Sequence, residues 1–388
     1  MNKSKTNDYS TLAMKISNLK HGGNVFANAK KLNLLPSEII DASASLVPFD
    51  PPQILIDSLN AGIKNLGFRY YPERNLSDLK EIIGKFHGIN PDNILPGNGA
   101  SELITWAGYE ASKFGISCIP SPSFVDYERS LNCWNSNFIH CELPKNWNNI
   151  FPQSFPLHPK GDVIWITNPH NPTGQLWEKN SLEEVVKKYK LVICDEAFLS
   201  ITPNGDKESL IPLTQRFDNL LVLRSLTKIF NIPGLRLGYV IGSSKKLKQW
   251  EINRDPWPLN SFAIKAGIDL LSNKKFYEQW TKQIHSWINI EKKRVFEKLS
   301  KIENLKVHNS STNFFLIESK TSLSPNIKYL ENKGILLREC TSFRFLDEKW
   351  ARISLQSKKN NTLLCLSLIH ISEPTRQEAI SYAVFCLK

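Results

Sequence analysis

The stretch LVLRSLTKIFNIPGLRLGY, Leu221–Tyr239, joins a strand-like apolar run to a lysine. Ser225, Thr227 and Lys228 follow the run at once, and Arg236 comes eight residues after the lysine. A continuous apolar run is typical of a strand buried on both faces of a parallel sheet. Ligands bind beyond the carboxyl ends of the strands in such sheets. The stretch therefore predicts that Lys228 lies at the mouth of a binding crevice.

Two further segments share this design. In GDVIWITNPHNPTG the run Val163–Ile166 precedes a turn that holds Asn171, and in KLVICDEAF the run Leu191–Cys194 precedes Asp195. Between them, an S-x-x-E pattern beginning at Ser181 predicts a capped helix. Upstream, DNILPGNGASELITW reads as a strand, a glycine-containing turn and a helix. These patterns predict an α/β protein with a mainly parallel sheet, whose polar strand ends converge on one crevice.

The chain changes character after residue 255. A long amphipathic helix is predicted there, followed by short strand candidates in TNFFLIES and KWARISLQ. We expect an N-terminal arm with part of a small domain (1–44), a large domain (45–255) and a small α+β domain (256–365). The helix is indicated by its spaced apolar residues, which are Phe276, Trp280, Ile284, Trp287, Ile288, Val295 and Leu299.

The last segment, Leu366–Lys388, has an unusual composition. LSLIHISEPTR resembles one reading frame of a common sequencing adapter, and ISYAVFCL resembles the translation of another part of that adapter. We expect residues 366–388 to be a non-native tail and the native closing helix to be missing, so that the small domain is truncated. The alternative is a genuine closing helix.

The overall composition excludes several classes of protein. The 388 residues carry a formal charge of +12, but the lysines are dispersed among Asn and Glu, as on solvated helix faces. We therefore expect no nucleic-acid partner. No apolar run reaches the length of a membrane helix, and the N-terminus lacks a signal core, which predicts a cytoplasmic protein. The seven cysteines show no metal-ligand or disulfide spacing, so no metal site is predicted.

The polar residues fit the chemistry of pyridoxal 5′-phosphate (PLP). A desolvated lysine near cations has a lowered pKa, and its free amine forms a Schiff base with an aldehyde. PLP also needs a carboxylate at its ring nitrogen, for which Asp195 is the candidate. Phe124 supplies an aromatic face and Asn171 a donor for the ring oxygen. The phosphate needs helix-start amides, hydroxyls and a guanidinium, and the candidates are Gly99, Ala100, Ser101, Ser225, Thr227 and Arg236.

Each of these residues also has an ordinary interpretation. Lys228 alone fits a solvated loop lysine, Asp195 a helix cap, Asn171 turn chemistry and Phe124 a core position. The order in which they occur together is much more specific than any one of them.

In this order the sequence resembles the class I/II aminotransferase family of PLP fold type I enzymes, over Asn24–Leu364. The resemblance implies a seven-stranded, mainly parallel sheet, with Lys228 as the catalytic Schiff-base lysine. It also implies a homodimer, in which Tyr71 of YYPERN reaches the phosphate bound by the partner subunit. One departure is Phe198 in DEAF, where many relatives carry tyrosine; its loss leaves Asn171 as the main partner of the ring oxygen.

Finer features resemble the threonine-phosphate decarboxylase branch of the cobalamin pathway. They are HGGN at residues 21–24, DPWPLNSFA at 255–263 and LLRECTSFRFLDEKWARIS at 336–354. The alternative is histidinol-phosphate aminotransferase, a close cousin. By this resemblance Arg352 holds the carboxylate of a phosphorylated amino acid or amine substrate, and Arg338, His21 and Gly22 lie near its phosphate and carboxylate. His21 also fits a histidine of a disordered arm.

Another departure concerns the substrate. Ser45 stands where the branch commonly has asparagine, and a shorter hydroxyl donates fewer hydrogen bonds. Decarboxylation and transamination use the same residues, so spacing alone does not separate them. Two rival hypotheses remain. One is a non-catalytic PLP-binding module of a regulator, for which the chain shows no helix-turn-helix pattern; the other is an inactive, truncated fragment.

Overall fold

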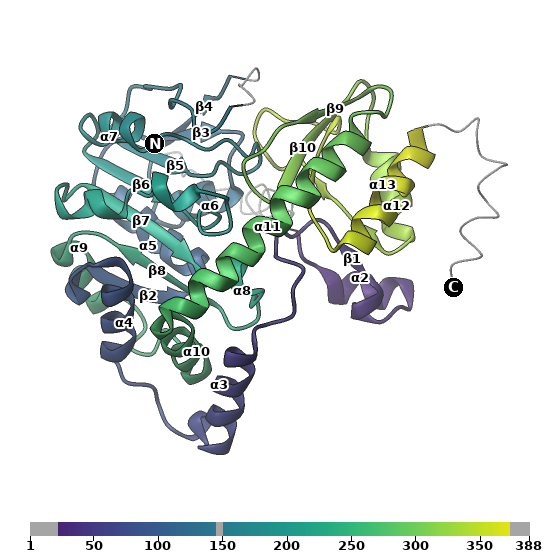
Figure 1. Cartoon of the computed structure of the whole chain (residues 1–388). Coiled ribbons are helices and arrows are strands. Elements are labelled where there is room, and N and C mark those ends of the chain that lie inside the picture. The colour runs from purple at the N-terminus through teal and green to yellow at the C-terminus, as the bar shows by residue number, and fades with distance from the viewer. Residues whose placement is uncertain (1–21, 145–149, 373–388) are drawn as a thin grey trace, which may run out of the picture.

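The computed structural model describes residues 22–144 and 150–372, with side chains to residue 369. It has a large part built on a seven-stranded sheet and a smaller part built on a four-stranded sheet (Figure 1). The helices are α2 (Val25–Leu32), α3 (Gln53–Lys64), α4 (Ser77–His87), α5 (Gly99–Ala111), α6 (Val125–Cys133), α7 (Lys179–Val186), α8 (Leu226–Phe230), α9 (Ser244–Asn253), α10 (Ser261–Ser272), α11 (Lys274–Leu299), α12 (Ser324–Asn332) and α13 (Lys358–Ser372).

The large sheet has the strand order β2-β8-β7-β6-β5-β3-β4. All neighbours in it are parallel except at β8, which runs antiparallel to both β2 and β7. The predicted seven-stranded, mainly parallel sheet is confirmed. Its strands are β2 (Ile94–Asn98), β3 (Ser117–Ser121), β4 (Phe138–Glu142), β5 (Val163–Thr167), β6 (Leu191–Asp195), β7 (Leu220–Ser225) and β8 (Leu237–Ile241).

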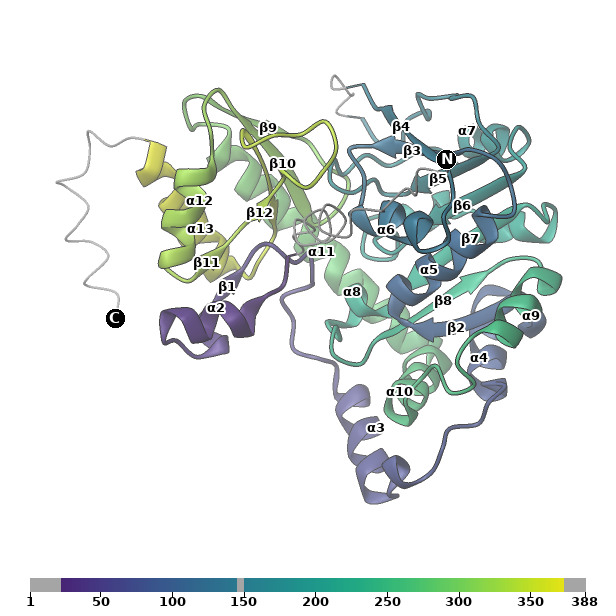
Figure 2. The same ribbon diagram turned by 180° about the vertical axis from the view of Figure 1, so that it is seen from behind.

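Helices cover both faces of this sheet. On one face α5, α6 and α9 pack against alternate strand residues such as Trp165 and Ile193, and these helices lie toward the viewer in Figure 2. On the other face Ile164 and Val192 join a larger cluster with α4, α7, α10 and the first part of α11. Because both faces are buried, the strands are continuously apolar, as the sequence indicates.

The helix predicted around Ser181 is present, but its start is different. α7 begins at Lys179, and no side chain caps it. Ser181 lies inside the helix, where its hydroxyl accepts a hydrogen bond from the Phe155 N–H at 2.7 Å. The predicted capping box is therefore wrong.

The smaller part has an antiparallel sheet in the order β12-β13-β10-β9 and a parallel pair, β1 with β11. The β1 strand comes from the N-terminal region, so that region is part of this body. The strands are β1 (Ile40–Asp41), β9 (Leu305–His308), β10 (Phe314–Ser319), β11 (Ile335–Leu336), β12 (Arg338–Glu339) and β13 (Trp350–Ser354).

The long helix α11 connects the two parts (Figure 1). Ile284 and Ile288 near its middle belong to the core of the large part, whereas Val295 and Leu299 near its end belong to the core of the small part. α10 also packs on α3 and α4 of the large part. The proposed boundary at 255/256 stays a prediction, since the chain crosses between the cores within α11.

A helix closes the small part in the described residues. α13 runs to Ser372, and its Leu364, Cys365 and Leu368 are buried in the small core. The start of the predicted non-native tail is thus helical here, where we expected no closing helix. The non-native origin of residues 366–388 stays a prediction, and most of that segment lies outside the described residues.

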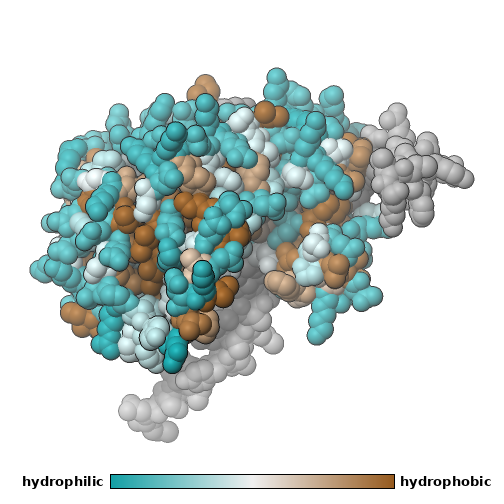
Figure 3. Space-filling model, turned by 60° about the horizontal axis from the view of Figure 1, so that its bottom comes forward, coloured by the Kyte–Doolittle hydropathy of each residue, from teal (hydrophilic) through white to brown (hydrophobic). Residues whose placement is uncertain are grey.

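The face of the molecule shown in Figure 3 is largely hydrophilic, with apolar patches among the polar residues. Exposed apolar residues include Ile63 of α3, and Leu66, Phe68, Tyr70 and Tyr71 in and around the short turn that follows α3. In residues 22–144 and 150–372, no helix combines the length and apolarity needed to cross a bilayer.

Candidate active site

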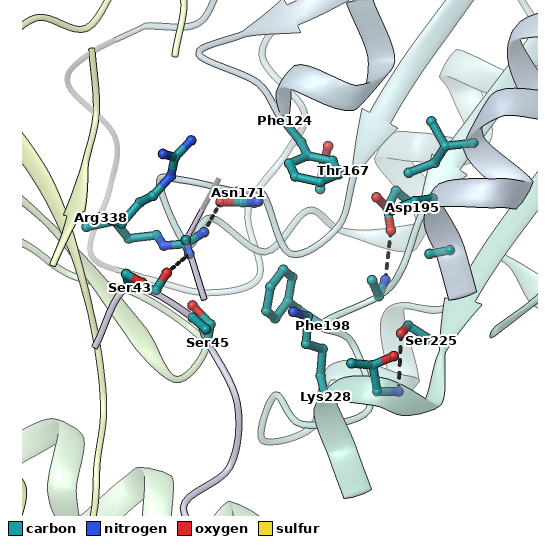
Figure 4. Close-up of a pocket in the computed structure, with 18 of the residues that line it drawn as sticks. Ser43, Ser45, Phe124, Thr167, Asn171, Asp195, Phe198, Ser225, Lys228 and Arg338 are labelled. Atoms are coloured by element: carbon teal, nitrogen blue, oxygen red, sulfur yellow. Dashed lines mark hydrogen bonds between the residues drawn. The ribbon is translucent and has the colours of Figure 1, made fainter. Parts of the chain in front are cut away.

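A cavity of about 210 Å³ lies where the carboxyl ends of the central strands meet the small part (Figure 4). β6 ends at Asp195, the turn after β5 holds Asn171, and α8, which follows β7, carries Lys228. The wall is formed by Gly22, Ser43, Ala44, Ser45, Ala100, Ser101, Ile104, Phe124, Thr167, Asn171, Asp195, Ala197, Phe198, Ser225, Thr227, Lys228, Arg236, Arg338, Phe343 and Arg352. Segments from residue 22 to residue 352 therefore share one site.

The Lys228 amine is held in an environment that disfavours its charge. Its Nζ lies 5.4 Å from the centroid of the Phe198 ring. Burial lowers the pKa of Lys228 from 10.5 to about 8, and the positive charges of Arg352 and Arg236 act in the same direction. Asp195 and Asp41 oppose this shift. Roughly a tenth of the amine is thus neutral at pH 7, far more than for an ordinary lysine, and the neutral amine is the form that acts as a nucleophile or base.

The Asp195 carboxylate is buried and fixed in place at both oxygens. Oδ2 accepts a hydrogen bond from the Tyr127 hydroxyl at 2.7 Å, and Oδ1 accepts one from the Ala197 N–H at 3.0 Å. Burial raises the pKa of Asp195, and these two hydrogen bonds oppose that effect. Tyr127 also contacts the Thr167 hydroxyl at 2.9 Å. A buried carboxylate with no direct salt bridge among the described residues suits a protonated ring nitrogen.

The start of α5 forms a cradle that fits an anion. Gly99 has φ +73°, and a Cβ added there would lie 2.5 Å from Nη2 of Arg236. Arg236 itself has φ +60°. Only glycine allows the guanidinium to approach this backbone so closely. Ala100, Ser101, Ser225 and Thr227 line the cavity beside it, so the residues present fit a phosphate group.

Two arginines from the small part enter the cavity opposite Lys228. Arg352 on β13 donates through Nη1 to Oδ1 of Asn171 and through Nη2 to the Ser43 carbonyl at 2.9 Å. Its neighbour in register, Arg338 on β12, donates to the Ser342 hydroxyl at 2.7 Å. Burial lowers the pKa of both, that of Arg352 to about 10. Both guanidinium groups stay charged at neutral pH and fit two anionic groups of one small molecule.

The N-terminal residues border the cavity at this side. Gly22 packs against Ser43, since a Cβ at Gly22 would lie 2.5 Å from the Ser43 carbonyl oxygen. Gly22, Ser43 and Arg338 also line a second cavity of about 670 Å³. The predicted His21 lies outside the described residues.

Tyr71 is the predicted residue that the structure places elsewhere. It is 79% exposed and stacks on Trp257, with ring centroids 4.4 Å apart. It does not line the cavity of its own chain. The contact of Tyr71 with the phosphate bound by a partner subunit stays a prediction.

The two departures from the family pattern both lie at the cavity. Phe198 forms part of its wall and places no polar atom there. Ser45 is buried, and its hydroxyl pairs with that of Ser354 at 2.7 Å. Ser45 therefore faces β13 through its hydroxyl, two residues along from Arg352.

Sequence reasoning missed several residues that shape the site. Tyr127 lies three residues after Phe124, one helical turn along α6, and this spacing is a signal that could have indicated it. Thr167 and Ser43 gave weaker signals. Thr167 is one strand-end residue among several, and Ser43 binds Arg352 through its backbone carbonyl, which every residue type carries.

Comparison with known proteins agrees with this geometry. Residues 37–368 match the sequence pattern of the family described as aminotransferase class I and II. The chain belongs to this family. Its members are enzymes that depend on PLP, the cofactor expected from the sequence.

Named relatives divide between two activities. The chain is 31% identical over 361 residues to a proposed threonine-phosphate decarboxylase of Caldanaerobacter subterraneus, covering 91% of this chain and 94% of the relative. It is 28% identical to the threonine-phosphate decarboxylase of Salmonella typhimurium, covering 92% and 98%. It is also 28% identical to a histidinol-phosphate aminotransferase of Caldanaerobacter subterraneus, covering 84% and 92%.

Solved structures show the same division. The histidinol-phosphate aminotransferase of Clostridium acetobutylicum has a TM-score of 0.76 at 27% identity, covering 87% of this chain and 100% of that one. The L-threonine-O-3-phosphate decarboxylase of Porphyromonas gingivalis has a TM-score of 0.74 at 26% identity, covering 86% and 100%. An aminotransferase of Sinorhizobium meliloti with bound PLP shares the fold, with a TM-score of 0.77 at 16% identity over 96% of this chain and 99% of that one.

Proposed function

We propose that the chain is a PLP-dependent L-threonine O-3-phosphate decarboxylase. The observation that carries this proposal is the meeting of Lys228, Asp195 and Arg236 with two buried arginines, Arg338 and Arg352, in one cavity. The first three residues fit the cofactor. The other two fit a substrate with both a carboxylate and a phosphate.

In this proposal the cofactor is held at four places. Lys228 would bind its aldehyde carbon, and Asp195 would hold its ring nitrogen. Asn171 would donate to its ring oxygen, and the turn at Gly99 with Arg236 would hold its phosphate. Phe124 would supply an aromatic face for the ring. When bound, the cofactor supplies an electron sink for the bonds at the substrate Cα.

The residues of the chain then decide which bond breaks. Arg352 binds the substrate carboxylate, and Arg338 binds its phosphate, which fixes the rotation about Cα. Once the substrate amine had replaced Lys228 at the aldehyde carbon, the freed lysine amine would be able to exchange a proton with Cα. For decarboxylation, the carboxylate would leave as CO₂, the electron pair of the broken bond would be taken up by that electron sink, and the protonated lysine amine would then deliver a proton to Cα.

Two observations favour the decarboxylase. Identity is 31% to one proposed decarboxylase, whereas it is 28% both to the second decarboxylase and to the aminotransferase. Gly22 of the HGGN opening also borders the cavity beside Arg338. The alternative function is that of a histidinol-phosphate aminotransferase. Ser45 favours this alternative, because it stands where the decarboxylase branch commonly has asparagine.

We further propose a homodimer located in the cytoplasm. The dimer is supported by Tyr71, which is exposed and does not line its own cavity, and by the exposed apolar residues Phe68 and Tyr70 close to it in the sequence. Sedimentation of the purified chain tests the assembly.

Product analysis tests the activity. The enzyme is incubated with threonine phosphate in one reaction, and with histidinol phosphate and 2-oxoglutarate in another. Aminopropanol phosphate and CO₂ from the first reaction support the decarboxylase. Glutamate from the second, with no product in the first, contradicts it in favour of the aminotransferase.

A further inference from the structure

Arg254 is a buried arginine that does not line the cavity. It contacts both sides of residues 97–101, the turn in which β2 passes into α5. Its side chain is only 3% exposed. Nη1 donates to the Pro96 carbonyl on β2 at 2.9 Å, and Nη2 donates to Oε2 of Glu102 in the first turn of α5 at 3.4 Å. One guanidinium therefore bridges the strand and the helix on either side of residues 97–101.

The Glu102 carboxylate lies inside the same turn. Its Oε2 accepts a hydrogen bond from the Asn98 N–H at 3.0 Å, which satisfies one of the free amides at the helix start. It also packs on Gly97, where an added Cβ would lie 2.5 Å from Oε2. Glu102 therefore holds the backbone of the turn in place at Gly97 and Asn98.

This carboxylate has an electrostatic cost. Its negative charge lies in the first turn of α5, and it directly follows in sequence Ala100 and Ser101, which line the cavity where the dianionic phosphate is expected. The negative charges of Glu102 and of the phosphate repel each other, and such repulsion is strongest where solvent is excluded. A positive charge on the buried side of the turn offsets this repulsion, and Arg254 provides it. Glu102 in turn raises the pKa of Arg254, against the lowering by burial.

We infer that Arg254 is a positioning residue for the cofactor phosphate. It holds Pro96 and Glu102 in place and neutralises Glu102, so that the turn offers its N–H groups to a dianion. The inference rests on the proposed function, because it takes the Gly99–Ser101 turn as the phosphate site.

Comparing PLP with pyridoxal tests this role. Pyridoxal has the same aldehyde and ring but no phosphate. Dissociation constants for both are measured from the visible absorbance of the covalently attached cofactor in the full chain. We expect Arg254→Met to weaken PLP binding by about tenfold, as for one lost charge-assisted contact, and to change pyridoxal binding by less than about twofold. Equal changes for both compounds, or none, overturn the inference.

A second substitution separates charge from shape. In the Arg254→Met background, Glu102→Gln removes the uncompensated carboxylate and is expected to restore PLP binding to within about threefold of wild type. Continued weak binding of PLP overturns the role of charge compensation. Should Arg254→Met fail to fold, Arg254→Lys keeps the charge, and its expected PLP affinity lies between about twofold and tenfold below wild type. An unchanged PLP affinity in Arg254→Lys with altered pyridoxal binding overturns the inference.

Arg294 offers a matched control. It pairs with the buried carboxylate of Glu291 in the small part, away from the phosphate turn. Arg294→Met is expected to change stability and leave the ratio of PLP to pyridoxal affinity unchanged. If wild-type protein shows no preference for PLP over pyridoxal, the proposed phosphate site itself fails. If wild type prefers PLP and Arg254→Met keeps that preference, only the inference about Arg254 fails.

Discussion

Arg352 donates a hydrogen bond from Nη1 to Oδ1 of Asn171, which joins the small part of the molecule to the large one inside the cavity. Since Oδ1 is engaged, the amide nitrogen is the end of Asn171 that can donate to a cofactor. The same guanidinium binds the Ser43 carbonyl. One arginine thereby orders three segments that are distant in the sequence, and substrate binding and cofactor orientation meet at this residue.

Asn171→Asp tests the orientation of this amide. The aspartate keeps an acceptor for Arg352 but loses the donor to the ring oxygen, and Phe198 offers no hydroxyl in its place. We expect PLP to bind about fivefold more weakly, as for one lost hydrogen bond. Absorbance titration measures this. Asn171→Ala, which also leaves Arg352 without this acceptor, is expected to bind more weakly still. Wild-type affinity in Asn171→Asp would show that the amide does not donate to the cofactor.

The rate of cofactor uptake is expected to depend on pH through Lys228. Its pKa is about 8, so the neutral amine increases about tenfold per pH unit below this value and levels off above it. The rate constant for appearance of the visible absorbance should follow the same curve. Arg352→Gln removes one of the cations that lower this pKa, so the inflection should move to higher pH. An inflection that stays in place, or moves lower, contradicts this electrostatic account.

Arg338 is expected to provide selectivity for a phosphorylated substrate. Arg338→Met should reduce kcat/KM for threonine phosphate by about 10- to 100-fold, the range for one charged hydrogen-bonding contact. The effect should be mainly on KM, because the residue binds a group that does not react. Exposed Arg344, in the segment between β12 and β13, provides the control, and Arg344→Met should leave the kinetics unchanged. Equal losses in both variants would argue against a specific phosphate contact.

A buried ion pair behind the active site is expected to stabilise the fold. Nε of Arg224 on β7 lies 2.9 Å from Oε2 of Glu196, which directly follows Asp195. Glu196→Ala leaves this guanidinium with one carboxylate fewer and should lower the free energy of unfolding by about 3–5 kcal/mol in urea. The Arg216–Glu183 pair is more exposed, so Arg216→Ala should cost less than about 1 kcal/mol. Similar losses from both substitutions would contradict this distinction.

The convergence of Lys228, Asp195 and Asn171 could be predicted because each follows an apolar run, and parallel strands end at one edge of a sheet. The antiparallel direction of β8 could not be predicted, since an apolar run does not indicate in which direction its strand runs. Tyr127 and Arg254 were also missed. Tyr127 lies on α6 and Arg254 directly follows α9, and both helices pack on a face of the sheet. The position of such a helix depends on packing between residues distant in the sequence. The cap predicted at Ser181 was wrong because a tertiary contact with Phe155 competes for its hydroxyl.

The central claim is that one lysine carries the cofactor. The enzyme saturated with PLP is reduced with borohydride and digested, and the modified peptide is identified by mass spectrometry. We predict a single modified lysine, Lys228, in the peptide that follows Arg224, and no modification of the site in Lys228→Ala. Stable modification at a different lysine, or none in protein that has bound PLP, would contradict the account.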